Sequence, residues 1–173
     1  MTAPFAPAGV DYAESRLHEL RKTRMVMVDG NLTANSETTE GGSSARVFDK
    51  GYWGFASTPA MDDEAVQKVA KKATENARTM CRFGDQPSLD IPSESHQGEY
   101  GFNGGPPLSQ SEAIELLEGL NAHCREKYPT LKSASFMMQQ ENHEKRLATS
   151  NGSDGLSTIN RSCLLYTSDA ADE

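Results

Sequence analysis

The sequence predicts an α+β fold: a mostly antiparallel sheet, built as a meander of hairpins, with two helices packed on one face. In the N-terminal part of the chain, turn signals separate short apolar runs that alternate as strands do. The hydrophobic period then lengthens to three and four residues over two helical segments, and strand-like runs return after the second. For this order of elements, the simplest packing places both helices on the same side of one sheet.

The first predicted hairpin lies near the N-terminus. Residues 12–20 and 23–28 have a β-like pattern, and the second run leads directly into Asp29-Gly30. This pair is typical of a two-residue type I′ turn, in which both residues adopt positive φ. The return strand is expected over residues 32–39.

The next turn is expected at residues 41–44, where two glycines precede two serines. A further hairpin then joins residues 45–48 to residues 52–56 around Gly51, because a residue without a Cβ atom adopts positive φ at little cost. These strands complete the N-terminal part of the predicted meander.

Two helices follow. Asp62 is a suitable N-cap for the first, and the apolar residues behind it recur at helical spacing: Ala65, Val66, Val69, Ala70, Ala73, Ala77 and Met80. Because most of these side chains are small, the helix is expected to lie close to the sheet. The second helix begins at Ser109, where Glu112 completes a capping box, and Pro129 ends it.

The remaining strands are expected at residues 133–140, 145–150 and 156–160, with polar turns at 141–144 and 151–155. Three other segments carry no regular pattern. The chain is therefore divided into a flexible arm at residues 1–10, a domain at 11–161 whose helices are linked by a loop at 84–108, and a tail at 162–173.

Composition and charge exclude several classes of protein. A formal charge of −8 and a pI near 5.0 disfavour a nucleic-acid-binding surface, which needs clustered Lys and Arg. No apolar run is long enough to span a bilayer, and the first residues lack the features of a signal peptide. Cys81, Cys124 and Cys163 show no paired spacing, so they are expected to be reduced structural thiols. These observations predict a cytoplasmic protein with no membrane contact.

The four histidines, His18, His96, His123 and His143, are the candidate metal ligands. His143-Glu144 begins like the His-Glu-x-x-His motif of metallopeptidases, but neither Leu147 nor Ala148 is a histidine, and the segment lies in a predicted turn. Each histidine is therefore interpreted as a surface imidazole. The sequence predicts no catalytic, cofactor-binding or metal-binding residue in this chain.

Two other groups of residues are candidate sites. Ser43 and Ser44 follow a glycine pair but lack the motifs of a phosphate cradle or a nucleophile elbow, so a hairpin turn is the preferred interpretation. Trp53 and Phe55 share one face of a strand and form either part of the core, which is favoured, or a peptide-binding platform. An exposed strand edge would accept an extended peptide by β-augmentation.

Three stretches carry a resemblance to a known family: the hairpin and helix start at residues 46–65, the run at 11–19 and the Val-Asp-Gly-Asn-Leu turn at 28–32. Together they resemble the N-terminal part of the TldD/PmbA family, and residues 148–155 are similar to a turn that follows a strand in these proteins. The resemblance implies cytoplasmic zinc metallopeptidases, or their inactive partner subunits, and peptides as substrates.

The resemblance also implies that the zinc site, a His-Glu-x-x-x-His helix with later ligands, lies downstream of the matched region. Residues 162–173 resemble a translated sequencing artefact, so they are expected to be a non-native tail on a truncated chain. The expected function is that of a non-catalytic N-terminal fragment of a zinc-dependent peptidase. The alternative is a metal-free partner or scaffold subunit, which would join a homologous subunit in a hetero- or homodimer.

Overall fold

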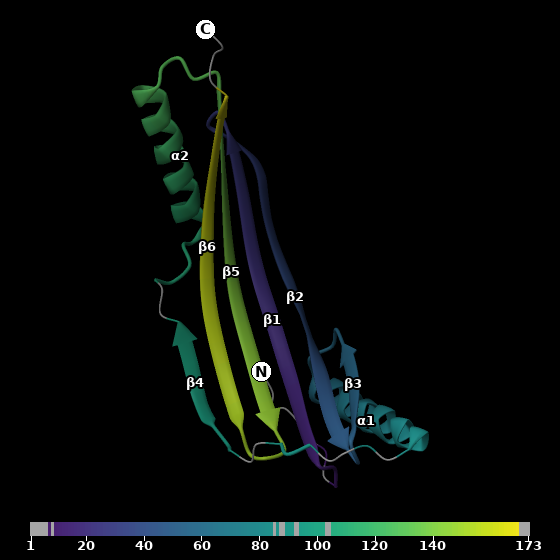
Figure 1. Ribbon diagram of the computed structural model, residues 1–173. Helices are drawn as coiled ribbons and strands as arrows, with labels where there is room; N and C mark the ends of the chain where they lie inside the picture. The colour runs from purple at the N-terminus through teal and green to yellow at the C-terminus, as the bar shows by residue number, and fades with distance from the viewer. Residues whose placement is uncertain are drawn as a thin grey trace. The chain divides into compact units, whose positions relative to one another are not determined.

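The computed structural model describes residue 7 and residues 9–84, 86, 89–91, 94–102 and 105–169. Within these residues the elements are β1 (Tyr12–Val28), β2 (Asn31–Asp49), β3 (Tyr52–Thr58), α1 (Asp63–Met80), the short 3-10 helix η1 (Cys81–Phe83), β4 (Gln97–Phe102), α2 (Gln110–Lys127), β5 (Ser133–Thr149) and β6 (Asp154–Asp169). The strands form one sheet in the order β3-β2-β1-β5-β6-β4 (Figure 1). This arrangement confirms the predicted α+β class.

The described chain forms two compact units. Unit 1 contains Met1–Leu20, Glu40–Gly101 and His143–Thr158, and unit 2 contains Arg21–Thr39, Phe102–Asn142 and Ile159–Glu173. The long strands β1, β2, β5 and β6 therefore contribute one section to each unit, whereas α1 belongs to unit 1 and α2 to unit 2. Each helix packs on strands of its own unit.

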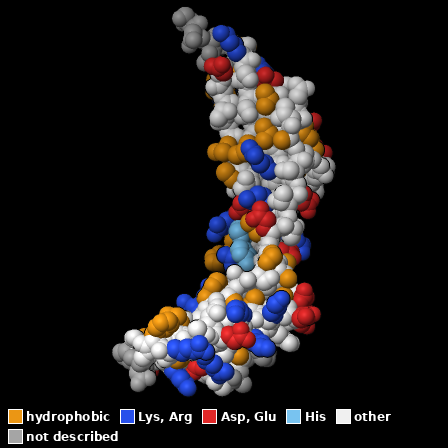
Figure 2. Space-filling model, turned by 90° about the vertical axis from the view of Figure 1, so that its right-hand side faces the viewer, with side chains coloured by type: hydrophobic (Ala, Val, Ile, Leu, Met, Phe, Trp, Pro, Cys, Tyr) orange, Lys and Arg blue, Asp and Glu red, His pale blue; other side chains and the backbone are white. Residues whose placement is uncertain are grey.

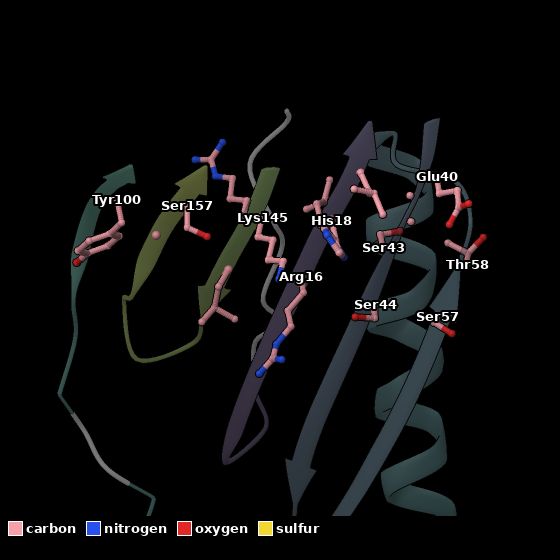
Figure 3. A pocket seen from close by; sticks show the side chains of 17 residues that line it. Arg16, His18, Glu40, Ser43, Ser44, Ser57, Thr58, Tyr100, Lys145 and Ser157 are labelled. Atoms are coloured by element: carbon pink, nitrogen blue, oxygen red, sulfur yellow. The ribbon is translucent and has the colours of Figure 1, made fainter. Parts of the chain in front are cut away.

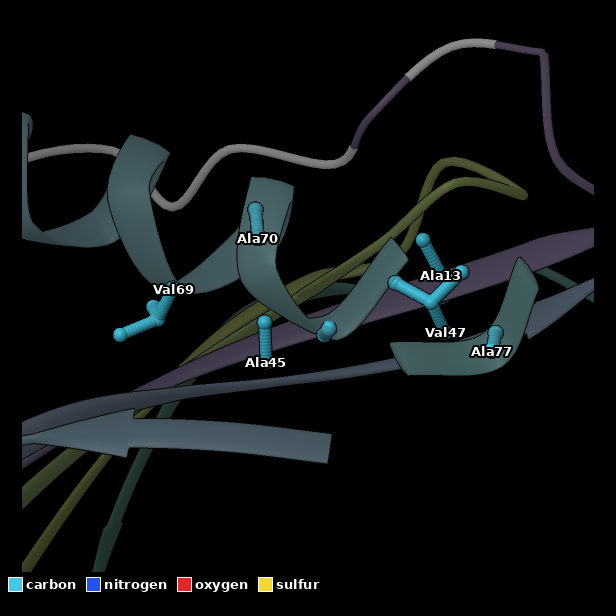
Figure 4. Close-up of a cluster of buried hydrophobic side chains, with 7 residues drawn as sticks. Ala13, Ala45, Val47, Val69, Ala70 and Ala77 are labelled. Carbon is cyan, nitrogen blue, oxygen red and sulfur yellow. The ribbon is translucent and has the colours of Figure 1, made fainter. Parts of the chain in front are cut away.

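The core of unit 1 is made of small side chains (Figure 4). Ala13, Ala45 and Val47 from the strands pack against part of the buried stripe of α1, namely Val69, Ala70, Ala73 and Ala77. Gly54 of β3 lies directly under this helix: a Cβ atom there would be 2.0 Å from the Ala73 carbonyl oxygen. The close helix–sheet contact predicted from the alanine stripe is thus confirmed.

The core of unit 2 has larger side chains. Met25 and Met27 of β1 pack with Ala134, Phe136 and Met138 of β5 and with Ala113 and Leu117 of α2. Both predicted helix caps are present. The Asp62 carboxylate accepts a hydrogen bond from the Ala65 amide at 2.8 Å, and Ser109 and Glu112 form the complete capping box.

Two of the predicted turns have the expected geometry. Asp29 and Gly30 have φ of 51° and 80°, and Lys50 and Gly51 have φ of 50° and 85°. Positive φ at both central residues is the requirement of a type I′ turn. The hairpins β1–β2 and β2–β3 therefore begin where the sequence places them, and β2 and β3 pair antiparallel, with Val47 opposite Gly54.

Two predicted turns are absent, because the strands continue through them. The prediction of a turn at 41–44 is wrong, because these residues lie within β2. The two glycines there allow other backbone groups to approach closely. A Cβ atom would be 2.8 Å from the His18 carbonyl oxygen at Gly41 and 2.5 Å from the Thr58 carbonyl oxygen at Gly42. The turn at 141–144 is also wrong, since β5 runs unbroken from Ser133 to Thr149.

The predicted loop at 84–108 contains the strand β4, and the last strand, β6, continues into the predicted tail. β4 has no buried residue, which explains why its sequence lacks a hydrophobic pattern. In Figure 1 its arrow points the same way as that of the neighbouring β6. β6 extends through residues 162–169 of the predicted tail, all of them exposed. Residues 170–173 and most of the arm at 1–10 lie outside the described residues.

Asp29 joins three elements of unit 2 and gives a testable pH dependence. Its carboxylate accepts hydrogen bonds from the Ala134 amide at 2.8 Å, from the Ser133 hydroxyl at 3.2 Å and from Arg125 near the C-terminus of α2. The Ala134 amide is the largest cause of a lowered pKa, and Ser133 and Arg125 lower it further. A lowered pKa in the folded state means that the carboxylate stabilises unit 2 fully above its unfolded pKa of about 4. This contribution is lost as the pH falls through the folded pKa.

Asp29→Asn is expected to lower the stability of unit 2 at pH 7 but much less below the folded pKa of Asp29, while keeping a residue that tolerates positive φ. Urea unfolding of both proteins between pH 7 and pH 3, followed by circular dichroism, measures this. A constant difference in unfolding midpoint over the whole pH range would show that the Asp29 charge is not its cause.

Candidate functional site

A hollow of about 890 Å³ on unit 1 is the candidate functional site. Its lining comes from β1, β2, β3, β5, β6 and β4, so that side chains far apart in sequence meet there (Figure 3). We call it the unit 1 hollow. Its polar and charged lining residues include Arg16, His18, Glu40, Ser44, Ser57, Thr58, Tyr100, Lys145, Arg146 and Ser157.

The unit 1 hollow carries an excess of positive charge. Arg16, Lys145 and Arg146 line it, and Glu40 is the single acidic lining residue among those described. Arg146 is neutralised by Asp154, with its Nε and Nη2 atoms 3.1 Å and 2.9 Å from the two carboxylate oxygens. This pairing lowers the pKa of Asp154. The other two positively charged lining residues are Arg16, which is also ion-paired, and Lys145.

The buried carboxylate of Glu14 contacts two arginine side chains beside the unit 1 hollow. Glu14 Oε1 lies 3.1 Å from Arg16 Nη2 and 3.1 Å from Arg46 Nε, and its Oε2 accepts a hydrogen bond from the Tyr12 hydroxyl at 3.0 Å. Burial raises the pKa of Tyr12, and the hydrogen bond to Glu14 adds to this shift. One carboxylate thus fixes the positions of two guanidinium groups.

Two histidines that are 125 residues apart in sequence meet in this unit. His18 Nε2 lies 3.1 Å from His143 Nδ1, and the rings stack with centroids 5.4 Å apart. Desolvation lowers the pKa of His18, and the neighbouring Lys145 and His143 lower it further. Figure 2 shows histidine side chains on a surface that also carries Lys and Arg.

Beside the unit 1 hollow lies an aromatic patch formed by Tyr12, Trp53 and Phe55, with the buried ring of Phe48 close to Trp53. The Trp53 ring lies 5.1 Å from Phe48 and 6.0 Å from Tyr12, and the guanidinium of Arg46 lies 4.5 Å from its centroid. Trp53 is 40% exposed and Phe55 is 59% exposed, so the interpretation of this pair as core is wrong. The two faces of β3 differ. On one face Gly54 lies under α1, and on the other the rings of Trp53 and Phe55 are exposed.

The other residues considered from the sequence lie outside the unit 1 hollow or serve the fold. His96 and His123 are exposed, and His96 lies 3.8 Å from Glu94. Ser43 is buried and donates a hydrogen bond to the Ala60 carbonyl at 2.7 Å. Cys81 and Cys124 are partly buried, and Cys163 is exposed.

The residues described do not fit a zinc site. A catalytic zinc ion takes three protein ligands, whereas His18 and His143 supply two imidazoles beside the cationic Lys145. No group of three His, Cys, Asp or Glu side chains suited to a metal ion occurs in the described part of the chain. In the described part of the chain, no helix is both long and apolar enough to cross a membrane.

Residues 13–77 match the family model described as PmbA/TldA metallopeptidase domain 1. The N-terminal region of this chain belongs to the TldD/PmbA family. No curated protein matches the sequence. The resemblance inferred from residues 11–19, 28–32 and 46–65 is thereby confirmed.

Solved structures share the fold of this TldD/PmbA-type region and extend it to nearly the whole chain. A putative modulator of a DNA gyrase from Thermotoga maritima MSB8 is 17% identical, with a TM-score of 0.65 over 93% of this chain and 36% of that one. TldE from Thermococcus kodakarensis is 16% identical, with a TM-score of 0.60 over 94% of this chain and 37% of that one. A putative modulator of DNA gyrase from Bacteroides thetaiotaomicron VPI-5482 is 16% identical, with a TM-score of 0.61 over 94% and 41%. The chain thus spans well under half the length of these structures.

Proposed function

We propose that residues 11–161 act as the non-catalytic N-terminal domain of a TldD/PmbA-like zinc-dependent metallopeptidase that cleaves peptides or unfolded proteins in the cytoplasm. The observation that carries the proposal is the match of residues 13–77 to the first domain of PmbA/TldA metallopeptidases. The solved structures of the same fold are more than twice as long as the matched chain, which leaves room for a catalytic part elsewhere.

The chemistry of zinc supports a catalytic part that is separate from this domain. Peptide hydrolysis on zinc needs three ligands, an open coordination position for water and a carboxylate that handles the water proton. The two histidines of unit 1 lie beside the cationic Lys145, which disfavours a bound metal cation, so the zinc ligands are assigned to another part of the protein. In this proposal the present domain shapes the site and binds peptide or a second subunit.

The alternative is a metal-free partner or scaffold subunit, which would pair with a homologous subunit in a hetero- or homodimer. The fold is matched at similar TM-scores by TldE and by two putative gyrase modulators, so the fold alone does not favour either proposal. The alternative differs from the first proposal only in the chemistry of the remaining part of the protein.

Sequencing the source locus beyond the codon for Glu173, followed by expression of the longer reading frame, separates the two. The first proposal predicts a His-Glu-x-x-x-His helix, stoichiometric zinc and cleavage of an unfolded substrate such as casein. A chelator should abolish this cleavage, and so should Glu→Gln in the motif. An extended frame without the motif favours the scaffold subunit. Zinc binding with peptidase activity from the 173-residue chain alone would contradict both.

A further inference from the structure

We infer that the unit 1 hollow and the adjoining aromatic patch together bind an extended peptide segment that carries carboxylate side chains. The inference rests on the proposed function, because it specifies which peptides the domain would select.

An uncompensated positive charge lies next to the aromatic patch. Glu14 is the carboxylate shared by Arg16 and Arg46, so two cations face one anion. The Glu14 side chain is only 8% exposed, whereas Arg16 is 58% and Arg46 is 48% exposed. The carboxylate therefore lies beneath the two guanidinium groups and leaves their outer N–H donors accessible. Guanidinium groups fixed in this way are suited to a second carboxylate.

Lys145 adds a second positive charge to the lining of the unit 1 hollow. Lys145 is exposed, lines the unit 1 hollow and has no ion-pair partner among the described residues. Its charge reaches His18, whose pKa it helps to lower after desolvation, the larger cause. The whole chain has a formal charge of −8, so this local excess of positive charge runs against the composition. An anionic ligand would form ion pairs with both Arg16 and Lys145.

The surface continues beyond the charged region. A smaller hollow of about 260 Å³ shares Arg16 and Ser44 with the unit 1 hollow and is also lined by Phe55. Exposed aromatic rings and cations are thus placed side by side. A peptide that alternates apolar and acidic side chains complements this order.

The size and the remaining lining favour a peptide over a small anion. A volume of about 890 Å³ lies near the upper end of ligand sites and is far larger than a single phosphate or acetate requires. The hydroxyl groups of Ser44, Ser57 and Ser157 can donate to or accept from peptide backbone groups. Leu20 and Leu147 add apolar surface within the same lining.

The test uses the whole 173-residue chain and the fluorescence of Trp53, its single tryptophan, which lies in the aromatic patch. Three capped peptides share the same Phe and Gly residues and carry Glu, Gln or Lys at the other positions. The Glu peptide is expected to bind about tenfold more tightly than the Gln peptide, and the Lys peptide not to bind. Affinity for the Glu peptide should fall between 0.1 M and 1 M salt, since the Debye length shrinks from about 10 Å to about 3 Å. Equal binding of the Glu and Gln peptides would overturn the inference.

Matched variants locate the binding surface. Lys145→Gln is expected to weaken binding of the Glu peptide about two- to fivefold, the range of an exposed ion pair, and Lys145→Glu about tenfold. Lys68→Gln removes the same charge from an exposed position on α1 and should leave binding unchanged. Circular dichroism of each variant checks that it is folded. Unaltered binding by Lys145→Glu would refute the assignment, and no zinc or cleavage enters this test, so its failure is distinguishable from failure of the proposed peptidase.

Discussion

Gly54→Ala is expected to destabilise unit 1 by about 3 kcal/mol or more, at or above the upper end of the usual cost of overpacking. The added Cβ atom would lie 2.0 Å from the Ala73 carbonyl oxygen and 2.4 Å from the Ala77 amide nitrogen. Both atoms belong to the backbone of α1, so no side-chain rotation relieves the contact, and the helix has to move away from β3. Urea unfolding followed by circular dichroism and by Trp53 fluorescence measures the loss.

The matched control is Gly119→Ala in α2, where nothing lies within 4 Å of the added Cβ atom. This exposed helical position should gain about 0.5–1 kcal/mol, because alanine loses less backbone entropy than glycine in a helix. The same chemical change is thus expected to have opposite signs at the two sites. An unfolding midpoint of Gly54→Ala equal to that of the unaltered chain would disprove the close packing of α1.

The features that the sequence predicts correctly are those encoded by a few adjacent residues. Asp62 and Ser109 cap their helices, and the pair Asp29-Gly30 forms its turn, because each depends on hydrogen bonds or φ values within one short segment. The alanine stripe of α1 is equally local, since helical periodicity alone places those residues on one face. Such signals are readable without knowledge of the rest of the chain.

The features that the sequence does not predict depend on contacts between residues that are far apart in the sequence. Gly41 and Gly42 favour a turn locally, but in β2 they allow close approach of His18 and Thr58 backbone atoms. The polar segment at 141–144 remains a strand although its own residues do not favour one. Pairing with neighbouring strands supplies what local propensity lacks.

The candidate site could not be found from the sequence for the same reason. His18 and His143 are separated by 125 residues and meet only through the order of strands in the sheet. Arg16, Arg46 and Glu14 come from β1 and β2, and no spacing rule links them to Lys145 of β5. The one sequence feature that points to the site is the pair Trp53 and Phe55. For this pair a peptide-binding platform is the less favoured of the two interpretations from the sequence.

Phe136→Ala is expected to destabilise unit 2 by about 3–5 kcal/mol, the usual cost of removing a buried aromatic ring. Phe136 is 2% exposed and lies between Met25, Met27 and Leu117 in the core cluster of this unit. Removing the ring leaves a cavity that β-strand and helix backbones cannot fill. Phe136→Leu retains most of the volume and should cost less than about 1.5 kcal/mol. Chemical unfolding of both variants measures the two values, and equal costs would contradict a tightly packed core.

The same residue tests whether the last strand section contributes to the fold. Tyr166 lies in the segment predicted as a non-native tail, yet its ring is 5.0 Å from that of Phe136. A double-mutant cycle with Tyr166→Ala isolates this contact, and an aromatic pair is expected to give a coupling of about 0.5–1.5 kcal/mol. A coupling of that size means that residues 162–169 stabilise unit 2 whatever their origin. If the two substitutions are additive instead, the Tyr166 ring contributes nothing there, and the interpretation of this segment as a tail gains support.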